Sequence, residues 1–320
     1  MNYRLWAGLY AQNTRIARTK LAAFPPDRYE AVLQIASFYN LARLPGRVTV
    51  SYHDATLATL LRSPFRVGRE HPTGAEDSLA YERALYHQVD HLFTMSAWAK
   101  DSIARDFDVP AEKITVAGAG VNLRRIGPIV GKSYDEPAVL FVGKEFGRKG
   151  GETLLRAFAQ ARERTPSATL TIVGPRTLEA IPAGVRFIGP LDTDTDEGLD
   201  RLLAEYARAT IFAMPSLYEP FGIAYLEAMA HALPCLASDQ YAMPEIVEHE
   251  RTGFNTPVGD SAQLARALGT LLESRDLRAE MGRRARERYE SRFGWERAAR
   301  IIQNVTQTLV PGARSDRNAS

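Results

Sequence analysis

The chain has 320 residues, of which 45% are hydrophobic and 24% charged, with a formal net charge of +2. This length accommodates two domains of ordinary size, and the near-neutral charge argues against nucleic acid as a partner. No apolar run is long enough to span a membrane, no secretory leader is evident at the N-terminus, and the single cysteine fits a reducing compartment. We therefore expect a cytoplasmic location.

Residues 1–26 contain four basic side chains and no acid, interleaved with leucine, isoleucine and tryptophan. This pattern fits a surface helix packed on a sheet, which is the interpretation that we favour. It also fits a basic amphipathic helix lying on an anionic membrane face. Peripheral contact with the inner face of the membrane therefore stays open as an alternative.

Short apolar runs alternate with helical patterns through the first part of the chain. Strands are predicted at 31–37, 47–53, 91–96 and 113–119, and helices near 76–90 and 97–107. Glycine, proline and charged residues then mix at 120–137, which is typical of a linker. We predict a first domain over residues 1–127.

The same alternation resumes after the linker. Strands are predicted at 138–143, 168–174, 185–189, 210–216 and 233–238, and helices near 150–164, 198–208, 222–232, 261–290 and 294–309. The strands are apolar at consecutive positions, as in parallel sheets that are covered on both faces. We predict a second domain over 128–310, with the helix 294–309 as a candidate to pack back on the first domain. Residues 311–320 are expected to be disordered.

The loop after the strand 138–143 is rich in glycine and contains Lys144, Arg148 and Lys149. Ligands of open parallel sheets lie beyond the carboxyl ends of the strands, where this loop is expected. A helix beginning near Gly151 would present free amides beside these cations, which together favour a phosphate. A solvated basic loop is the alternative. The spacing matches neither the G-x-G-x-x-G pattern nor the P-loop.

The segment 221–233 is apolar on all sides, so its helix should be buried. It nevertheless contains Glu227, and an ionised carboxylate is costly there unless a partner satisfies it. Glu227 would either accept hydrogen bonds from ligand hydroxyls or pair with a neighbouring arginine. Glu219 precedes the helix, where it would face the same ligand or simply favour the helix dipole.

Several segments, in order along the chain, resemble one known family. The stretch from Glu219 to Glu227 resembles the E-x7-E motif of retaining glycosyltransferases of family 4, which have the GT-B fold. The segment VGKEFGRKGGETLL resembles the family's G-R-x-x-x-x-K-G stretch, and EIVEHERTGFNTPVGD its E-I-V-x-x-G-x-T-G-x-L region. VTVSYHD resembles the strand that ends in a histidine on the acceptor side, and AGAGVNLRRI resembles the interdomain G-V-D segment.

The resemblance implies two groups of site residues. The catalytic group is Glu219, Lys149, Lys144 and His53. The donor-binding group is Glu227, Gly222, Ile223, Phe221, Leu191 and Gly143.

The resemblance also implies what each group does. Glu227 is expected to hydrogen-bond the donor ribose, and Glu219 to contact the transferred sugar. The two lysines should hold the diphosphate, although Lys144 stands where the family usually has arginine, so the bidentate fork is lost. The backbone at Leu191 should meet the nucleobase. His53 should lie near the transferred sugar, through its ring or the adjacent backbone.

Aspartates at 192, 194 and 196 form D-x-D twice over. Such a loop binds a divalent metal in the other major glycosyltransferase fold. We interpret it here as a solvated loop with Asp196 near a helix N-cap, because the lysines already supply positive charge. No metal and no other cofactor are expected.

We therefore expect an α/β protein of the GT-B fold, with two Rossmann-like, doubly wound domains facing a cleft. The family's first half usually opens with a strand and a glycine-rich loop near residue 10, so we expect the N-terminal domain to lack its usual first strands. The expected function is transfer of a sugar, with retention, from a UDP- or GDP-linked donor to a hydroxyl of a glycan or glycolipid. Two alternatives stay open: a non-catalytic sugar-nucleotide-binding or partner subunit, and a sugar-nucleotide epimerase.

Overall fold

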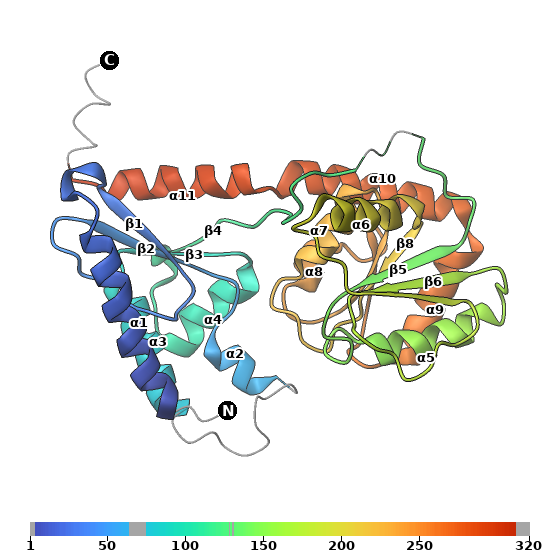
Figure 1. Cartoon of the computed structure of the whole chain (residues 1–320), viewed down its shortest axis with the longest axis horizontal. Coiled ribbons are helices and arrows are strands. Elements are labelled where there is room, and N and C mark those ends of the chain that lie inside the picture. The colour runs from blue at the N-terminus through green and yellow to red at the C-terminus, as the bar shows by residue number, and fades with distance from the viewer. Residues whose placement is uncertain (1–3, 64–74, 128, 130, 312–320) are drawn as a thin grey trace. The chain divides into compact units, whose positions relative to one another are not determined.

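The computed structural model describes residues 4–63, 75–127, 129 and 131–311. They form two compact units: one from Met1–Ala119 together with Trp295–Ser320, the other from Gly120–Gly294. Each unit contains its own parallel β-sheet with helices on both faces (Figure 1). Within the part of the chain that the structure describes, none of the helices combines the length and apolar character that crossing a membrane requires.

The first unit is built on a sheet of four parallel strands. Its strands are β1 (Ala31–Ile35), β2 (Val48–His53), β3 (His91–Thr94) and β4 (Ile114–Val116), in that order. Its helices are α1 (Arg4–Ala22), α2 (Leu57–Arg62), α3 (Ala75–Gln88), α4 (Ala97–Phe107) and α11 (Trp295–Leu309). The predicted strands and helices of this region are confirmed, with strands shorter at their ends. The short helix α2 was not predicted, although its N-cap Thr56 accepts a hydrogen bond from the amide of Thr59.

Alternation along β2 decides which side chains meet which helix. Val48, Val50 and Tyr52 pack against α11 on one face. The intervening residues, which include His53, point to the opposite face because successive side chains of a strand alternate. That face is covered by α3 and α4, whose core cluster contains Tyr86, Ile103 and Phe107 (Figure 1).

The second unit is built on a sheet of six parallel strands in the order β10-β9-β8-β5-β6-β7. The strands are β5 (Ala138–Val142), β6 (Thr169–Val173), β7 (Val185–Gly189), β8 (Ile211–Ala213), β9 (Cys235–Ser238) and β10 (Gly253–Thr256). The helices are α5 (Gly151–Arg162), α6 (Asp196–Arg208), α7 (Ile223–Ala230), α8 (Met243–Ile246), α9 (Ser261–Glu273) and α10 (Arg275–Arg292). The order reverses at β5, as in a doubly wound sheet, whereas the described strands of the first sheet follow chain order.

The prediction of one helix over 261–290 is wrong. The structure has two helices there, α9 and α10, which are separated at Ser274. The side chain of Ser274 accepts a hydrogen bond from the amide of Leu277, 3.2 Å away, and so acts as the N-cap of α10. Strand β10 and helix α8 were not predicted. The expected disordered tail, 311–320, lies outside the described residues apart from Pro311.

Candidate functional site

A cavity of about 180 Å³ lies at the carboxyl ends of β5, β6 and β7 in the second unit. It brings together four residues that the sequence analysis predicted as donor-binding or catalytic: Gly143, Lys144, Leu191 and Glu227. The other lining residues are Asn122, Leu123, Val142, Val173, Gly174, Pro190, Thr193 and Leu202. The lining is thus largely apolar, with one carboxylate and one cation, as is typical of small-molecule sites.

Glu227 is the buried carboxylate of this cavity, and 9% of its surface is exposed. The hydroxyl of Tyr206 donates to its Oε2 atom over 2.9 Å, and the backbone amide of Asn122 also donates to the carboxylate. Burial raises the pKa of Glu227 to about 7, against the lowering effect of these hydrogen bonds and of the charge on Lys149. Among the described residues its hydrogen-bond partners are a hydroxyl and an amide and not an arginine.

The loop that precedes α5 folds tightly on itself. Gly150 adopts a left-handed conformation with φ of 75°, and a Cβ there would lie 1.9 Å from the carbonyl oxygen of Pro215, so only glycine fits. The amide of Gly151 donates to the carbonyl of Phe146 over 2.9 Å, and the amide of Lys149 to that of Glu145. The amide of Gly151 itself is therefore engaged. The amides of Glu152 and Thr153 have no acceptor among the described residues, so the start of α5 offers an anion free donors in addition to the lysine side chains.

Lys149 connects the cavity to Glu219. Its Nζ atom forms an ion pair with the carboxylate of Glu219, and its Cγ atom would lie 3.0 Å from a Cβ placed on Gly143. Burial, and then the charge of Arg148, lowers the pKa of Lys149 to about 8. Arg148 itself lies 3.8 Å from Glu219 and pairs with Glu145.

The start of α7 lies next in sequence to Glu219. Gly222 is its N-cap, with a left-handed φ of 86°, and a Cβ there would lie 2.6 Å from the ring of Tyr225. Phe221 is buried beside it. In the part of the chain that the structure describes, the amides of Gly222 and Ile223 have no hydrogen-bond acceptor. These two amides are free donors at the positive end of a helix.

His53 is the one predicted site residue that belongs to the first unit; the other nine belong to the second. It ends β2, and only 2% of its surface is exposed. Its Nε2 atom lies 2.6 Å from the hydroxyl oxygen of Ser51, and its ring meets that of Tyr86 edge-on at 5.0 Å. Burial lowers the pKa of His53 to about 3, so the imidazole is neutral at physiological pH.

The aspartate-rich loop holds its own turn and starts α6. The amide of Asp194 donates to Asp192 over 3.1 Å, and Asp196 pairs with Arg124 at 3.2 Å. The N-cap is Thr195, one residue before Asp196, and it accepts from the amide of Gly198. All three aspartates are exposed. No cluster of three or more potential metal ligands is found among the described residues.

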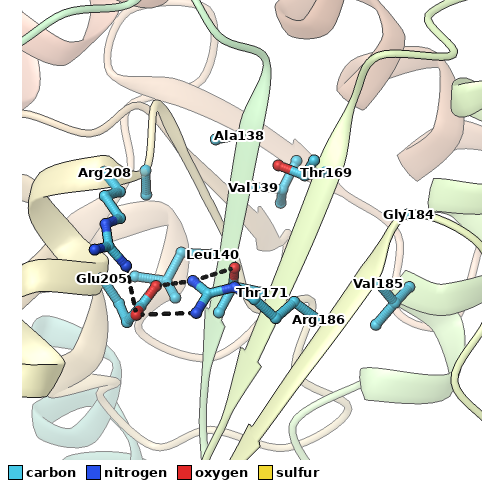
Figure 2. Close-up of a pocket in the computed structure, with 11 residues that line it drawn as sticks. Ala138, Val139, Leu140, Thr169, Thr171, Gly184, Val185, Arg186, Glu205 and Arg208 are labelled. Carbon is cyan, nitrogen blue, oxygen red and sulfur yellow. Dashed lines mark hydrogen bonds and ion pairs between the residues drawn. The ribbon is translucent and has the colours of Figure 1, made fainter.

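A second cavity, of about 360 Å³, lies along the amino-terminal halves of the same three strands. Figure 2 shows that Arg186 and Arg208 both point toward Glu205, with Arg186 also reaching Thr171. Both arginines are paired with Glu205, and the cavity lies away from the strand ends at which open sheets bind ligands. We assign no function to it.

Two residues that donate hydrogen bonds to the carboxylate of Glu227 were missed by the sequence analysis. Tyr206 lies in the amphipathic helix α6, where its spacing indicates burial and nothing marks the role of its hydroxyl. Asn122 contributes a backbone amide, which any residue except proline could provide.

Comparison with known proteins places this geometry in a family. Residues 127–288 match the family described as Glycosyl transferases group 1, and residues 6–125 match Glycosyltransferase Family 4. The chain belongs to the glycosyl transferases group 1 family. The resemblance found in the sequence is thus confirmed.

Two curated relatives illustrate the relation. Glycogen synthase of Mycobacterium tuberculosis is 31% identical over 246 residues, which cover 73% of this chain and 58% of that protein. D-inositol 3-phosphate glycosyltransferase of Streptomyces scabiei is 29% identical over 246 residues, which cover 70% of this chain and 55% of that protein. The chain therefore spans little more than half the length of these relatives.

Solved structures of this family's fold are similar to most of the chain. Sucrose-phosphate synthase from Thermosynechococcus elongatus matches with a TM-score of 0.76 at 22% identity, over 94% of this chain and 78% of that one. The Anabaena protein HepE, solved with UDP and glucose, matches with a TM-score of 0.60 at 22% identity, over 83% of this chain and 72% of that one. The fold is GT-B, with two Rossmann-like α/β units.

Proposed function

We propose that the protein transfers a sugar from a nucleoside-diphosphate sugar, UDP- or GDP-linked, to a hydroxyl group of a glycan or glycolipid, with retention of configuration. One observation carries this proposal. The buried carboxylate of Glu227 and the cation of Lys144 line one cavity at the carboxyl ends of the strands, and Lys149 extends from it to Glu219.

The positive charge of the site would act on the diphosphate. Lys149 and Lys144 would bind its oxygens, and the free amides of Gly222 and Ile223 would add fixed dipoles. Charge-assisted hydrogen bonds of this kind are about twice as strong as neutral ones. Because negative charge grows on the diphosphate as it departs, these preorganised groups favour the transition state over the bound donor.

The remaining contacts would orient the donor. Glu227 would accept hydrogen bonds from the ribose, and the backbone at Leu191 would meet the nucleobase in the apolar part of the cavity. Glu219 would contact the transferred sugar, held in place by its ion pair with Lys149. Support for a UDP-linked donor comes from HepE, whose structure holds UDP and glucose.

Retention is proposed to follow from departure and attack on the same face of the sugar. The bond from the anomeric carbon to the diphosphate oxygen breaks as the acceptor oxygen bonds to that carbon, and the hydroxyl proton passes to the departing phosphate. His53 would lie near the transferred sugar. Because its pKa is lowered to about 3, it would act as a neutral hydrogen-bonding group and not as a proton donor.

Calorimetry with UDP, GDP and ADP tests the donor site. We expect one of these nucleotides to bind, and Glu227→Gln to bind it more weakly while keeping its melting temperature. A melting loss with unchanged binding would instead make Glu227 a structural residue. If the wild-type chain binds none of the three, the proposal fails.

A product assay with the matching sugar nucleotide separates the alternatives. Transfer to an acceptor supports the glycosyltransferase. Isomerisation of the donor without transfer would identify an epimerase on the same fold. Binding with neither product would favour a non-catalytic sugar-nucleotide-binding or partner subunit.

Helix α1 supports a second, smaller proposal, which is peripheral contact with an anionic membrane. One side of the helix packs inward, since the ring of Tyr10 stacks on that of Tyr81 at 4.3 Å. On the other side, 45% of the surface of Ile16 and 48% of that of Leu9 are exposed, and the cation Arg15 is exposed beside them. Apolar and basic side chains on one exposed face fit an anionic lipid surface.

Co-sedimentation with vesicles tests this contact. We expect vesicles containing phosphatidylglycerol to bind the chain, neutral phosphatidylcholine vesicles to leave it in solution, and Ile16→Glu to weaken the binding. Equal recovery with both vesicles would leave α1 as a helix that only packs on its unit.

A further inference from the structure

The hydroxyl of Tyr206 is the side-chain hydrogen-bond donor to the carboxylate that faces the cavity. Tyr206 is fully buried in α6, and its hydroxyl donates to Oε2 of Glu227 over 2.9 Å. Burial and the charge of Glu227 hold the pKa of this hydroxyl well above its usual range, so it stays protonated. Tyr206 does not line the cavity itself and can act on a ligand only through Glu227.

The ring of Tyr206 is held in turn by His231. The two rings stack nearly parallel, with their centroids 4.7 Å apart and an interplanar angle of 8°. Only 1% of the surface of His231 is exposed, and burial lowers its pKa to about 4. The stacking partner of the tyrosine is therefore a neutral ring at physiological pH.

Both nitrogens of His231 are engaged, which fixes the ring. Its Nε2 atom lies 3.1 Å from the amide nitrogen of Gly127 and accepts that hydrogen bond. The proton must then be on Nδ1, which donates to the carbonyl oxygen of Glu227 over 2.7 Å. One imidazole thus ties the segment before β5 to the residue that carries the carboxylate.

A carboxylate that recognises two adjacent hydroxyls must be held in one orientation, because a freely rotating one loses entropy on binding. Tyr206 restrains the side chain of Glu227 at Oε2, and His231 restrains the backbone of the same residue. The hydrogen bond from Tyr206 partly offsets the cost of burying the acid, and together these contacts fix the direction of the carboxylate.

We propose that Tyr206 is a positioning residue for nucleoside recognition, whose hydroxyl, with its ring fixed by His231, orients the Glu227 carboxylate toward the ribose hydroxyls of the donor. This inference rests on the proposed function. It predicts that losing the hydroxyl of Tyr206 reduces recognition of the ribose and leaves recognition of the diphosphate unchanged.

The test is calorimetry with two ligands and three proteins. The ligands are the nucleoside diphosphate that binds the wild type and its 2′,3′-dideoxy counterpart. The proteins are the wild type, Tyr206→Phe and the control Tyr134→Phe. The control loses a hydroxyl that donates to the carbonyl of Ala232 over 2.6 Å, also in the second unit but outside the cavity.

We expect the wild type and the control to prefer the ribose form by about tenfold or more, as for loss of a hydrogen bond to a charged group. Tyr206→Phe should reduce this preference to about threefold or less, with unchanged affinity for the dideoxy form. It should also shift the pH at which ribose binding weakens upward, because Glu227 loses a hydrogen bond that favours its charged form.

Each other outcome overturns a separate claim. A full ribose preference in Tyr206→Phe, or an equal loss for both ligands, would make Tyr206 only structural. A wild type that binds the diphosphate without preferring ribose would overturn both the role of Glu227 and this inference. A wild type that binds no nucleoside diphosphate would overturn the proposed function and, with it, the inference.

Discussion

Each unit contains a buried glutamate whose pKa is raised by burial, and these two residues differ in how their oxygens are used. In the first unit Glu82 is 3% exposed, and burial raises its pKa to about 7. Both of its oxygens are occupied: Oε1 accepts from the hydroxyls of Tyr86 and Ser37, and Oε2 accepts from the amide of Leu57 at 2.8 Å. Glu82 therefore links α3 to the loop that follows β1 and to the first residue of α2.

In the second unit Glu227 has the same pKa of about 7, again because of burial. It has fewer hydrogen-bond partners and lines a cavity, and the charge of Lys149 acts to lower its pKa. A raised pKa therefore does not by itself identify a functional carboxylate. What separates the two residues is whether the carboxylate can still accept a hydrogen bond from a ligand.

The largest expected effect is on stability. Glu82→Ala should lower the free energy of unfolding by about 3 kcal/mol or more, because the amide of Leu57 and two hydroxyls would be left unpaired in the interior. Glu227→Ala should cost about 1 kcal/mol, since water can enter its cavity. Urea unfolding of both variants beside the wild type measures the difference. Equal losses would erase the distinction between a structural and an open carboxylate.

The next effect is a pH dependence that Glu82 should impose on stability. Its pKa in the folded chain is raised from 4.5 to about 7. The stabilisation of the folded state by the protonated Glu82 is therefore fully present below pH 4.5 and is lost as the pH rises through 7. Glu82→Gln cannot ionise. Raising the pH from 5 to 8 should therefore improve this variant relative to the wild type by about 1–3 kcal/mol. A constant difference across this range would show that Glu82 does not titrate near neutrality.

A smaller effect is expected on nucleotide affinity when Lys149, the cation near Glu227, is removed. Lys149→Ala should weaken nucleoside diphosphate binding about 10- to 100-fold, because a charge-assisted contact with phosphate is lost. Lys144→Ala, which removes an exposed cation, should weaken binding less. Lys113→Ala in the first unit is the control. Unchanged affinity in Lys149→Ala would remove this loop from the donor site.

The smallest expected effect is that of metal removal. EDTA should leave sugar transfer near its starting rate, and the double variant Asp194→Asn with Asp196→Asn should behave like the wild type. These exposed aspartates serve a turn and an ion pair with Arg124, and the lysines are proposed to neutralise the diphosphate. If chelation abolished activity, Mn²⁺ restored it and the double variant were inactive, a metal held by the aspartates would neutralise the diphosphate instead.

The sequence predicts the fold where one signal dominates. Consecutive apolar residues predict the central strands, and α4 is found at its predicted residues, 97–107, because Ser96 caps it and Pro110 follows it. The break between α9 and α10 was missed because both helices are long and a single serine separates them. A capping serine inside a helical pattern has the same local appearance as an exposed serine within a helix.

The site is predictable to the same extent. Glu227 could be found because an acid in an apolar helix is anomalous, and Lys149 because a basic glycine-rich loop is distinctive. Tyr206 and His231 could not, because their roles depend on contacts between α6, α7 and the segment at Gly127. His231, a polar side chain that directly follows the apolar helix α7, was the one available signal of such a contact.

Helix α11 affects the order in which the chain can be completed during synthesis. It belongs to the first unit and covers the side of β2 that bears Val48, Val50 and Tyr52, yet it is the last helix described. On the ribosome, every residue of the second unit emerges before α11 does. Until then the sheet of the first unit has one uncovered apolar face, so the unit that is synthesised first is completed last. Nascent chains that stall before Trp295 would expose this face and would need chaperones to prevent aggregation.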